Sequence, residues 1–301
     1  MLTDDRLRLV FTCCHPALAM EARVALTLKV VAGLSTGEVA RMFLVPEATM
    51  SQRLLRAKKR IANAGIPYKV PESADLAERL DGVLAVVYLV FTQGYAGGAA
   101  PELADEAIRL GRLLADLMPD EDEVSGLLAL MLAHHARRHA RLVDGELVTL
   151  EHQDRSRWDA AAVGEALALT MPPGRVPGPY RLQAELALAH LRAETAADTD
   201  WRRIVRLYDR LVVLQPSPVA LLSRAIALGM AESPAVGLLA LEELARYPAL
   251  QELHLLPAAR ADLLARAGRT TEAVVELDRA LALAPTEHER RQLARRRSEL
   301  A

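Results

Sequence analysis

Residues 33–61 read GLSTGEVARMFLVPEATMSQRLLRAKKRI, and this stretch decides the fold of the amino-terminal part of the chain. Ser35 followed three residues later by Glu38 is a capping box, in which each side chain accepts a hydrogen bond from the other residue's backbone N–H. The box predicts a short helix that ends near Phe43. Pro46 suits the first turn of a second helix, because its missing N–H would have no partner there. The sequence therefore predicts two helices joined by a brief turn.

The second helix of this stretch is predicted to run through about Ile61, with an apolar side and a basic side. The apolar side recurs at helical spacing and is suited to burial: it comprises Met50, Leu54, Ala57 and Ile61. The other sides carry Thr49, Ser51, Gln52, Arg53, Arg56, Lys58, Lys59 and Arg60. A short capped helix, a turn and a second helix with a basic face are typical of a helix-turn-helix module.

The basic side of this helix predicts DNA binding. In helix-turn-helix proteins the second helix enters the major groove, and its early residues reach base edges. Glutamine can pair bidentately with adenine and arginine with guanine, whereas phosphate contacts add affinity without sequence information. We expect base contacts from Thr49, Ser51, Gln52, Arg53 and Arg56, and phosphate contacts from Lys58, Lys59 and Arg60. A solvated basic helix in an ordinary helical bundle is the alternative interpretation.

The composition favours helix throughout the chain. Of the 301 residues, 51% are hydrophobic, 25% are charged and 4% are aromatic, and Ala, Leu and Arg dominate. These residue types favour helix over strand, so we predict an all-α fold. The net charge of −2 is unevenly distributed, because the stretch from Arg23 to Lys69 carries +7 and the residues after it carry −8. A small basic module joined to a large acidic one suits a protein of which one part binds a polyanion.

Helical patterns also surround and follow the basic module. We expect helices over residues 20–31, 76–91, 101–117 and 120–141, and a linker over residues 66–72. Gly94–Gly98 predicts a turn between two of these helices. Leu142–Leu150 predicts a β-hairpin, because Asp144-Gly145 lies between short alternating apolar runs. Met171–Tyr180 contains four Pro and two Gly, which predicts a boundary.

A repeat of about 34 residues is predicted in the last part of the chain. Pro216 and Pro285 lie 69 residues apart, and each ends a similar helical pattern. The spacing is that of the second helix of a tetratricopeptide (TPR) unit, whose stacked helix pairs form a curved surface for peptide or protein partners. A plain helical bundle is the alternative. The predicted domains are residues 1–65, residues 72–170 with a small hairpin near 142–150, and residues 178–301.

No pattern predicts catalysis, a cofactor or a metal ion. Gly94–Gly98 lacks a preceding strand and a Lys-Ser/Thr pair, so it favours a helix connection over a phosphate loop. Cys13 and Cys14 are adjacent, and neighbouring side chains rarely converge on one tetrahedral ion. The His134–His139 segment carries two arginines that oppose a cation. We expect a protein that is not an enzyme; a helical enzyme built on Gly94–Gly98 and His134–His139 is the rival hypothesis.

We expect the protein to be cytoplasmic, without a membrane partner. The first residues, MLTDDR, are charged where a secretory signal builds an apolar core. The longest apolar run, Val83–Phe91, is about half as long as a membrane span. Two cysteines suit a reducing compartment and cannot form a disulfide framework.

Residues 33–61 resemble region 4 of bacterial sigma factors of the extracytoplasmic-function (ECF) type. Asp4–Leu18, DDRLRLVFTCCHPAL, resembles the start of region 4 in the subgroup with a carboxy-terminal TPR-like extension. The resemblance implies contacts with the promoter −35 element and with the β-subunit flap of RNA polymerase. It places the family's DNA contacts on Thr49, Ser51, Gln52, Arg53 and Arg56. Many members have Gly-Thr-Val-Lys-Ser-Arg where residues 48–53 read ATMSQR, so the lysine is replaced here.

The later part of the chain resembles the same extension in four strings: Gln153–Asp159 (QDRSRWD), Gly178–Ala184 (GPYRLQA), Pro218–Ala225 (PVALLSRA) and His254–Leu264 (HLLPAARADLL). Ser223 stands where Asn is more usual. The resemblance therefore spans nearly the whole chain. The role of the charged and aromatic residues of the first string stays open between a binding groove and pairing within the fold: these are Arg155, Arg157, Trp158 and Asp159.

Sigma factors of this type also carry region 2, which binds the polymerase clamp and melts the −10 element. No stretch of these 301 residues corresponds to it. We expect that the chain is a fragment or is read from a late start, and that it does not initiate transcription alone. The resemblance implies a sigma-factor component that a TPR-like domain regulates, with a regulatory protein as a further partner. A stand-alone helix-turn-helix regulator whose TPR-like part senses a peptide or protein is the alternative.

Overall fold

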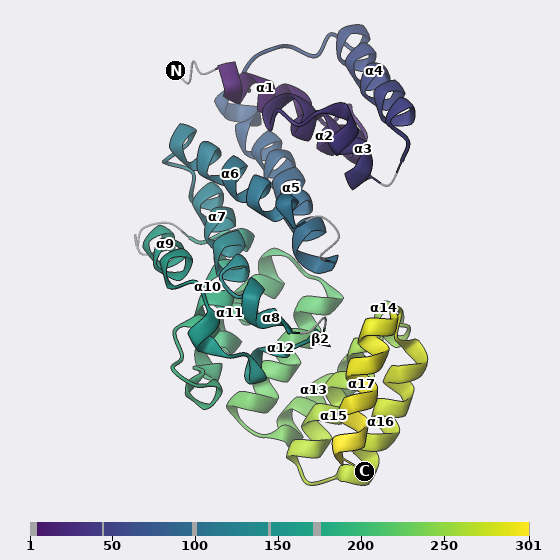
Figure 1. The fold of residues 1–301 in the computed structure, drawn as a ribbon. Coiled ribbons are helices and arrows are strands. Elements are labelled where there is room, and N and C mark those ends of the chain that lie inside the picture. Colours follow the sequence, from purple (N-terminus) through teal and green to yellow (C-terminus); the bar gives the residue numbers. More distant parts are fainter. Residues whose placement is uncertain (1–4, 44, 98–100, 144–145, 171–175, 301) are drawn as a thin grey trace. The chain divides into compact units, whose positions relative to one another are not determined.

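The computed structural model describes residues 5–43, 45–97, 101–143, 146–170 and 176–300 (Figure 1). Helices make up most of this part of the chain, so the all-α prediction is confirmed. The chain divides into two compact units, Met1–His135 and Ala136–Ala301. No helix among the described residues is long and apolar enough to cross a membrane.

The first unit contains the predicted helix-turn-helix and three further helices. Its elements are α1 (Asp5–Cys13), α2 (Met20–Leu26) with a π-helical turn at Thr27–Val31, α3 (Thr36–Met42), α4 (Glu47–Asn63), α5 (Ser73–Gly97), α6 (Glu102–Leu117) and α7 (Asp122–His135). Gly33 follows the π-helical turn with a φ of 81°, a conformation that glycine adopts without strain. Pro46 directly precedes α4 rather than lying in its first turn.

Helix α5 lies at the centre of the first unit. It packs against α6 and α7 and also against α1 and α2. Its buried side chains are Leu80, Val83, Leu84, Val86, Val87, Val90 and Phe91. Two arginines add hydrogen bonds to this packing: Arg79 Nη2 donates to the carbonyl of Phe11 at 2.8 Å, and Arg109 Nη2 of α6 donates to that of Ala32 at 3.3 Å. Helices α1 and α2, which precede the helix-turn-helix, therefore share a core with α5.

The prediction of a turn at Gly94–Gly98 was wrong, because α5 continues as a helix through Gly97. Gly98 lies outside the described residues. Gly94 is buried within the helix. The rings of Phe91 and Tyr95 stack with their centroids 5.4 Å apart, one helical turn from each other. Packing of this buried face outweighs the low helix propensity of glycine, which costs about 1 kcal/mol at each position.

The predicted single helix over residues 120–141 was wrong, because it is broken near Ala136. Helix α7 ends at His135, and a short helix, α8 (Arg138–Arg141), follows. In a continuous helix the N–H of Ala140 would donate to the carbonyl of Ala136. Here the N–H of Asp159 donates to that carbonyl at 2.9 Å, and the N–H of Ala140 donates to the carbonyl of Arg137 at 3.0 Å. A hydrogen bond from a distant residue therefore replaces the one that would have continued the helix.

The second unit begins with small elements and continues as a series of helices. It comprises α8, β1 (Leu142–Val143), β2 (Glu146–Leu147), short 3-10 turns at Leu150–His152, Arg155–Arg157 and Ala196–Asp198, α9 (Ala160–Thr170), α10 (Pro179–Leu191), α11 (Trp201–Leu214), α12 (Pro218–Ala231), α13 (Pro234–Leu244), α14 (Pro248–Gln251), α15 (Leu255–Arg266), α16 (Thr270–Leu283) and α17 (Glu287–Leu300). The strands β1 and β2 pair antiparallel where the hairpin was predicted; Asp144 and Gly145 lie outside the described residues. Residues 171–175 of the predicted boundary at Met171–Tyr180 lie outside them as well, and α10 begins within its second half, at Pro179.

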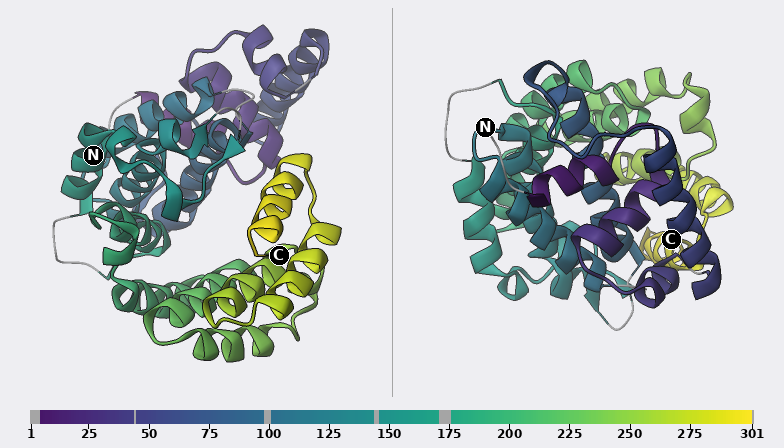
Figure 2. Two further views of the ribbon diagram at one scale, coloured as in Figure 1. Left: turned by 60° about the horizontal axis from the view of Figure 1, so that its bottom comes forward. Right: turned by 90° about the horizontal axis from the view of Figure 1, so that it is seen from above.

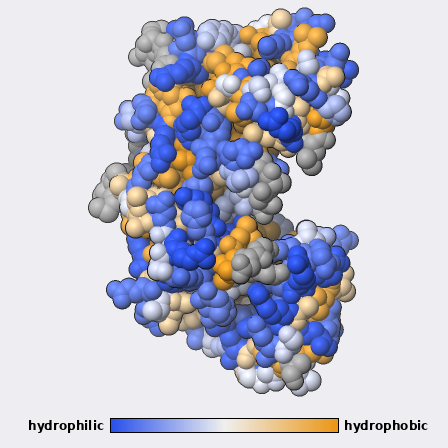
Figure 3. Space-filling model, viewed as in Figure 1, coloured by the Kyte–Doolittle hydropathy of each residue, from blue (hydrophilic) through white to orange (hydrophobic). Residues whose placement is uncertain are grey.

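Successive helices of the second unit pack on one another from α10 to α17. Figure 2 shows them following one another along a curve within this unit. Separate groups of buried aliphatic side chains lie among α10, α11 and α12, among α12, α13, α14 and α15, and between α15 and α16. Helix α17 has no buried residue, and hydrophilic residues cover most of the face over α16 and α17 in Figure 3.

The two helices α12 and α13 approach most closely at a pair of glycines. A Cβ atom added to Gly237 would lie 2.6 Å from the Cα atom of Gly229 and 2.6 Å from Cδ1 of Leu263. Real Cβ atoms do not come this close to backbone atoms. The crossing of α12 and α13 therefore requires that both positions lack a side chain.

We expect Gly237→Ala to lower the free energy of unfolding by about 1–3 kcal/mol, because the added methyl group forces α12 and α13 apart. Thermal unfolding followed by circular dichroism measures this change. Gly164→Ala in α9 is the matched control, since a Cβ atom there would meet no atom within 4 Å. This control should be neutral or slightly stabilising, because alanine favours helix. Equal effects of the two substitutions would contradict the close approach.

Candidate nucleic-acid interface

The apolar side of α4 anchors the candidate interface. Met50, Leu54 and Ala57 are buried, and α4 packs on α2 and α3 through this side. Ile61, the fourth predicted member of the stripe, is half-buried. Because a helix turns by 100° per residue, burying this stripe fixes which side chains of α4 point outward.

A capping box sets the start of α3 as the sequence predicts. Ser35 Oγ accepts from the N–H of Glu38 at 3.1 Å, and Glu38 Oε2 accepts from the N–H of Ser35 at 2.7 Å. Hydrogen bonds that the Ser35 hydroxyl and backbone N–H donate to the Glu38 carboxyl hold the pKa of this carboxyl below its usual value. Because folding lowers the pKa of Glu38, the ionised Glu38 carboxylate stabilises the fold. This stabilisation is complete above the pKa that Glu38 has in the unfolded chain, and it is lost as the pH falls through its pKa in the folded protein.

The structure brings the predicted site residues together on one helix and exposes all of them. They are Thr49, Ser51, Gln52, Arg53, Arg56, Lys58, Lys59 and Arg60. Within the described part of the chain, no carboxylate lies within ion-pairing distance of the four cations Arg56, Lys58, Lys59 and Arg60. Their charge is therefore available to an anionic partner.

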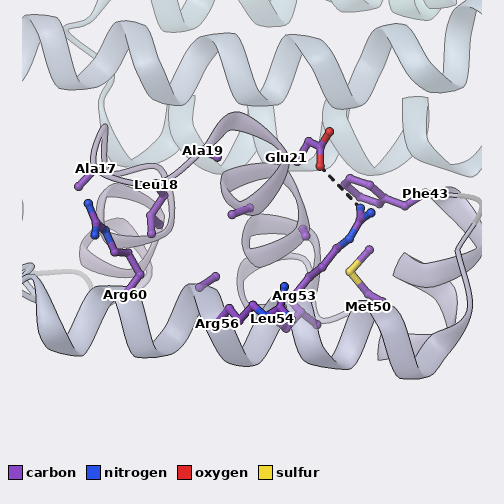
Figure 4. A pocket seen from close by; sticks show the side chains of 13 residues that line it. Ala17, Leu18, Ala19, Glu21, Phe43, Met50, Arg53, Leu54, Arg56 and Arg60 are labelled. Atoms are coloured by element: carbon purple, nitrogen blue, oxygen red, sulfur yellow. Dashed lines mark ion pairs between the residues drawn. The ribbon is translucent and has the colours of Figure 1, made fainter.

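Arg53 differs from the other cations of α4. Its Nη1 lies 3.6 Å from Oε2 of Glu21 on α2, and its side chain is 42% exposed (Figure 4). Arg53 therefore lies beside the buried stripe and reaches toward α2, whereas the sequence placed it on the face away from that stripe. No sequence pattern indicates this pair, because Glu21 lies 32 residues from Arg53 along the chain.

A groove of about 400 Å³ separates α2 from α4 beside this ion pair. It is lined by Ala17, Leu18, Ala19, Glu21, Ala22, Ala25, Phe43, Met50, Arg53, Leu54, Arg56, Ala57 and Arg60. Figure 4 shows Arg53 extending toward Glu21, and Arg60 extending toward Ala17 and Leu18. The groove exists because both helices present alanines where larger side chains would close the space.

The cysteines and histidines considered as metal ligands lie in other environments. Burial raises the pKa of the Cys13 thiol to about 12 and that of the Cys14 thiol to about 11, so both thiols stay protonated at neutral pH. The ring of His134 packs on Tyr95 with centroids 5.3 Å apart, and His135 Nε2 lies 3.1 Å from Asp105 Oδ1. Among the described residues, no group of three or more His, Cys, Asp or Glu side chains is arranged to hold a metal ion.

Two of the four residues left open in the QDRSRWD string, Arg155 and Asp159, make hydrogen bonds within the fold. Arg155 Nη1 donates to the carbonyl of His190 near the end of α10 and to that of Ala193 just beyond it, at 2.9 Å each. The Arg155 guanidinium lies 4.5 Å from the centre of the Trp158 ring. Asp159 Oδ1 accepts from the N–H of Ala162 and so caps α9. Arg157 is exposed.

Comparison with known proteins places the helix-turn-helix in a family. Residues 8–61 match the family described as Sigma-70, region 4, and residues 79–171 match a family of unknown function, DUF6596. The helix-turn-helix is thus similar to sigma-70 region 4, and this likeness supports a sigma-factor-type role in DNA binding and transcription. This match points to a transcription factor rather than an enzyme.

A protein of Rhizobium meliloti (strain 1021) is similar to this chain over most of its length. The relative, "Uncharacterized protein R00370", is 46% identical over 289 residues, and the match covers 93% of this chain and 68% of the relative. The chain therefore belongs to the same family as this protein. The relative's name gives no activity, so the function rests on the region 4 match and on the geometry of α4.

Ser35→Ala should lower the free energy of unfolding by about 1 kcal/mol, because it removes the side-chain cap of α3. Thermal unfolding of the full chain at neutral pH measures the effect. Ser51→Ala is the control within the same module, since Ser51 is exposed in the interior of α4 and alanine favours helix. If Ser35→Ala were no more destabilising than Ser51→Ala, the capping box would not contribute to the stability of the fold.

Proposed function

We propose that this chain is the −35-recognising part of a sigma factor of the ECF type, which acts in the cytoplasm together with RNA polymerase. The observation that carries the proposal is the arrangement of α4. One stripe of this helix is buried in a module that matches sigma region 4, and all eight predicted contact residues are exposed. Such a helix can lie in the major groove while its apolar side stays within the protein.

Within this proposal the residues of α4 divide between two tasks. The early residues Thr49, Ser51, Gln52, Arg53 and Arg56 would contact base edges of the −35 element. The late residues Lys58, Lys59 and Arg60 would contact phosphates. The DNA-bound module would meet the β-subunit flap of the polymerase through a different surface, as the resemblance to ECF sigma factors implies.

We further propose that the acidic part of the chain is a TPR-like regulatory domain that binds a regulatory protein. Support comes from short connections between neighbouring helices, such as residues 215–217 between α11 and α12 and residues 267–269 between α15 and α16. Short connections make neighbouring helices antiparallel, as in stacked helix pairs. Gly268 has a φ of 74° in the second of these connections. The domain bounds 1–65, 72–170 and 178–301 belong to the same proposal.

Substitutions at the two ends of α4 should affect DNA binding differently. Arg53→Ala should weaken binding to the selected sequence by about 1–3 kcal/mol and relax the preference at one base position. Lys59→Ala should weaken binding to all DNA sequences about equally. It should also reduce the slope of the logarithm of the binding constant against the logarithm of salt concentration by about 1, because one phosphate contact is lost.

The measurement is fluorescence anisotropy of the full chain with RNA polymerase core, on duplexes selected from a randomised library, over a series of salt concentrations. Glu299→Gln, on the exposed last helix, is a control that should leave the affinity unchanged. A uniform loss for both substitutions would show that α4 reads no bases. Tight, specific binding without polymerase would favour the stand-alone regulator instead.

A further inference from the structure

Helix α11 of the second unit carries a row of arginines along its exposed side. The helix packs on α10 and α12, and its buried stripe comprises Ile204, Leu207 and Leu211. Away from this stripe, arginines recur at four-residue spacing and form the arginine row: Arg202, Arg206 and Arg210. All three are exposed, and they are the only exposed residues of α11 between its first turn and Arg210. The outer side of this part of the helix is therefore made by guanidinium groups.

The arginine row is not neutralised within the fold. In the described part of the chain, no carboxylate lies within ion-pairing distance of any of its three members. The one acid on α11, Asp209, is held by Arg224 Nε of α12 at 2.6 Å. The fourth arginine of the helix, Arg203, pairs with Glu185 of α10 at 3.3 Å. A line of free positive charge thus lies in a part of the chain whose net charge is negative.

Other exposed arginines of this unit have a different environment. Each of three arginines beside or within α16 and α17 has a carboxylate of a residue three positions away, at 2.7, 2.8 and 3.5 Å: Arg269, Arg279 and Arg290. These pairs offset the charge where it arises. Exposure of an arginine alone therefore does not make a basic surface here, and the arginine row differs in lacking partners.

The length and the chemistry of the arginine row fit a phosphate backbone. Arg202 and Arg210 are eight residues apart, or about 12 Å along the helix axis. One strand of duplex DNA presents a phosphate about every 3.4 Å of its axis, so this length carries about three or four phosphates. The planar guanidinium donates two parallel hydrogen bonds to a phosphate. The row also meets the usual electrostatic signature of nucleic-acid binding, which is basic residues clustered along one helix.

The same face is less suited to an acidic protein helix. A helix that docks on a protein surface lays an apolar side into a hydrophobic groove. No apolar side chain of α11 is exposed between the members of the arginine row. The exposed Val213 and Leu214 lie beyond the row, in the last turn of the helix. Charge without an apolar floor favours a partner that is bound through charge, as phosphates are.

We propose that the arginine row of α11 contacts the phosphates of one strand of duplex DNA, as a second DNA surface of this chain in addition to α4. The contact is independent of sequence, because phosphates carry no base information. Two contacts with one DNA molecule reinforce each other, since the second forms within a complex that already exists. The choice of duplex DNA rests on the proposed function, whereas the phosphate contact of α11 does not.

The test measures how binding of the full chain to a labelled duplex depends on salt, by fluorescence anisotropy. The duplex has a random sequence and about 40 base pairs, or about 140 Å, which leaves room for both surfaces. The row variant combines Arg202→Gln, Arg206→Gln and Arg210→Gln. It should reduce the slope of the logarithm of the binding constant against the logarithm of salt concentration by about 2.7, because three phosphate contacts are lost.

Two further variants separate a phosphate contact from a change in net charge or in folding. The matched control combines Arg269→Gln, Arg279→Gln and Arg290→Gln, which removes the same charge from exposed arginines that have partners. Its slope should change by less than about 1, because these arginines contact no phosphate. Replacement of the arginine row by three lysines should keep the slope of the unchanged chain, since lysine binds phosphate as a point charge. Circular dichroism should show the same helix content in all variants.

The outcomes distinguish this inference from the proposed function. A row variant with the same slope as the matched control would overturn the phosphate contact and favour an acidic protein at this face. An equal loss with lysine and with glutamine would overturn it too, because positive charge would not be its cause. If the row variant lowered the slope while Lys58→Gln and Lys59→Gln left it unchanged, the α11 contact would stand and the proposed role of α4 would fail. The reverse result would retain α4 and overturn α11.

Discussion

The burial of α5 is the constraint on which the amino-terminal unit depends. The helix-turn-helix module alone is about 60 residues, a size at which a single core is marginal. Helix α5 supplies the missing apolar surface, because it packs on α1 and α2 and also on α6 and α7. Arg79 of α5 also donates to the carbonyl of Phe11 in the last turn of α1, where a positive charge is favourable. Helix α4 packs on α2 and α3 instead of on α5. Of its five predicted contact cations, only Arg53 has a carboxylate within ion-pairing distance among the described residues.

The two matching families do not coincide with the two compact units. The sigma region 4 match ends at residue 61, and the DUF6596 match covers residues 79–171, but the units divide after His135. The DUF6596 part therefore contributes α5, α6 and α7 to the first unit and α8 and α9 to the second. A cut near Pro71, where the sequence predicts a linker, would expose the sides of α1 and α2 that α5 covers. The segment of unknown function is thus an integral part of the DNA-binding unit.

The sequence predicted the elements whose cause is local and missed those whose cause is distant. The capping box at Ser35 and the stripe of α4 depend on residues within a few positions of each other, and both are present in the structure. The extension of α5 through Gly97 and the break after His135 depend on aromatic packing and on a hydrogen bond from Asp159, so local propensity could not show them. The pair between Glu21 and Arg53 joins two helices in space and likewise has no local pattern.

The position of Arg53 shows why a charge pattern alone cannot define a binding face. A helix with one buried stripe has two margins and one outer side, and cations at the margins can serve a neighbouring helix as well as an outside ligand. In α4, Lys59 lies on the outer side, whereas Arg53 and Arg60 line the margin that faces α2. The alanines of α2 leave that margin open instead of covering it. Arg53 is thus paired with Glu21 inside the module, whereas Arg60, on the same margin, has no carboxylate within ion-pairing distance among the described residues.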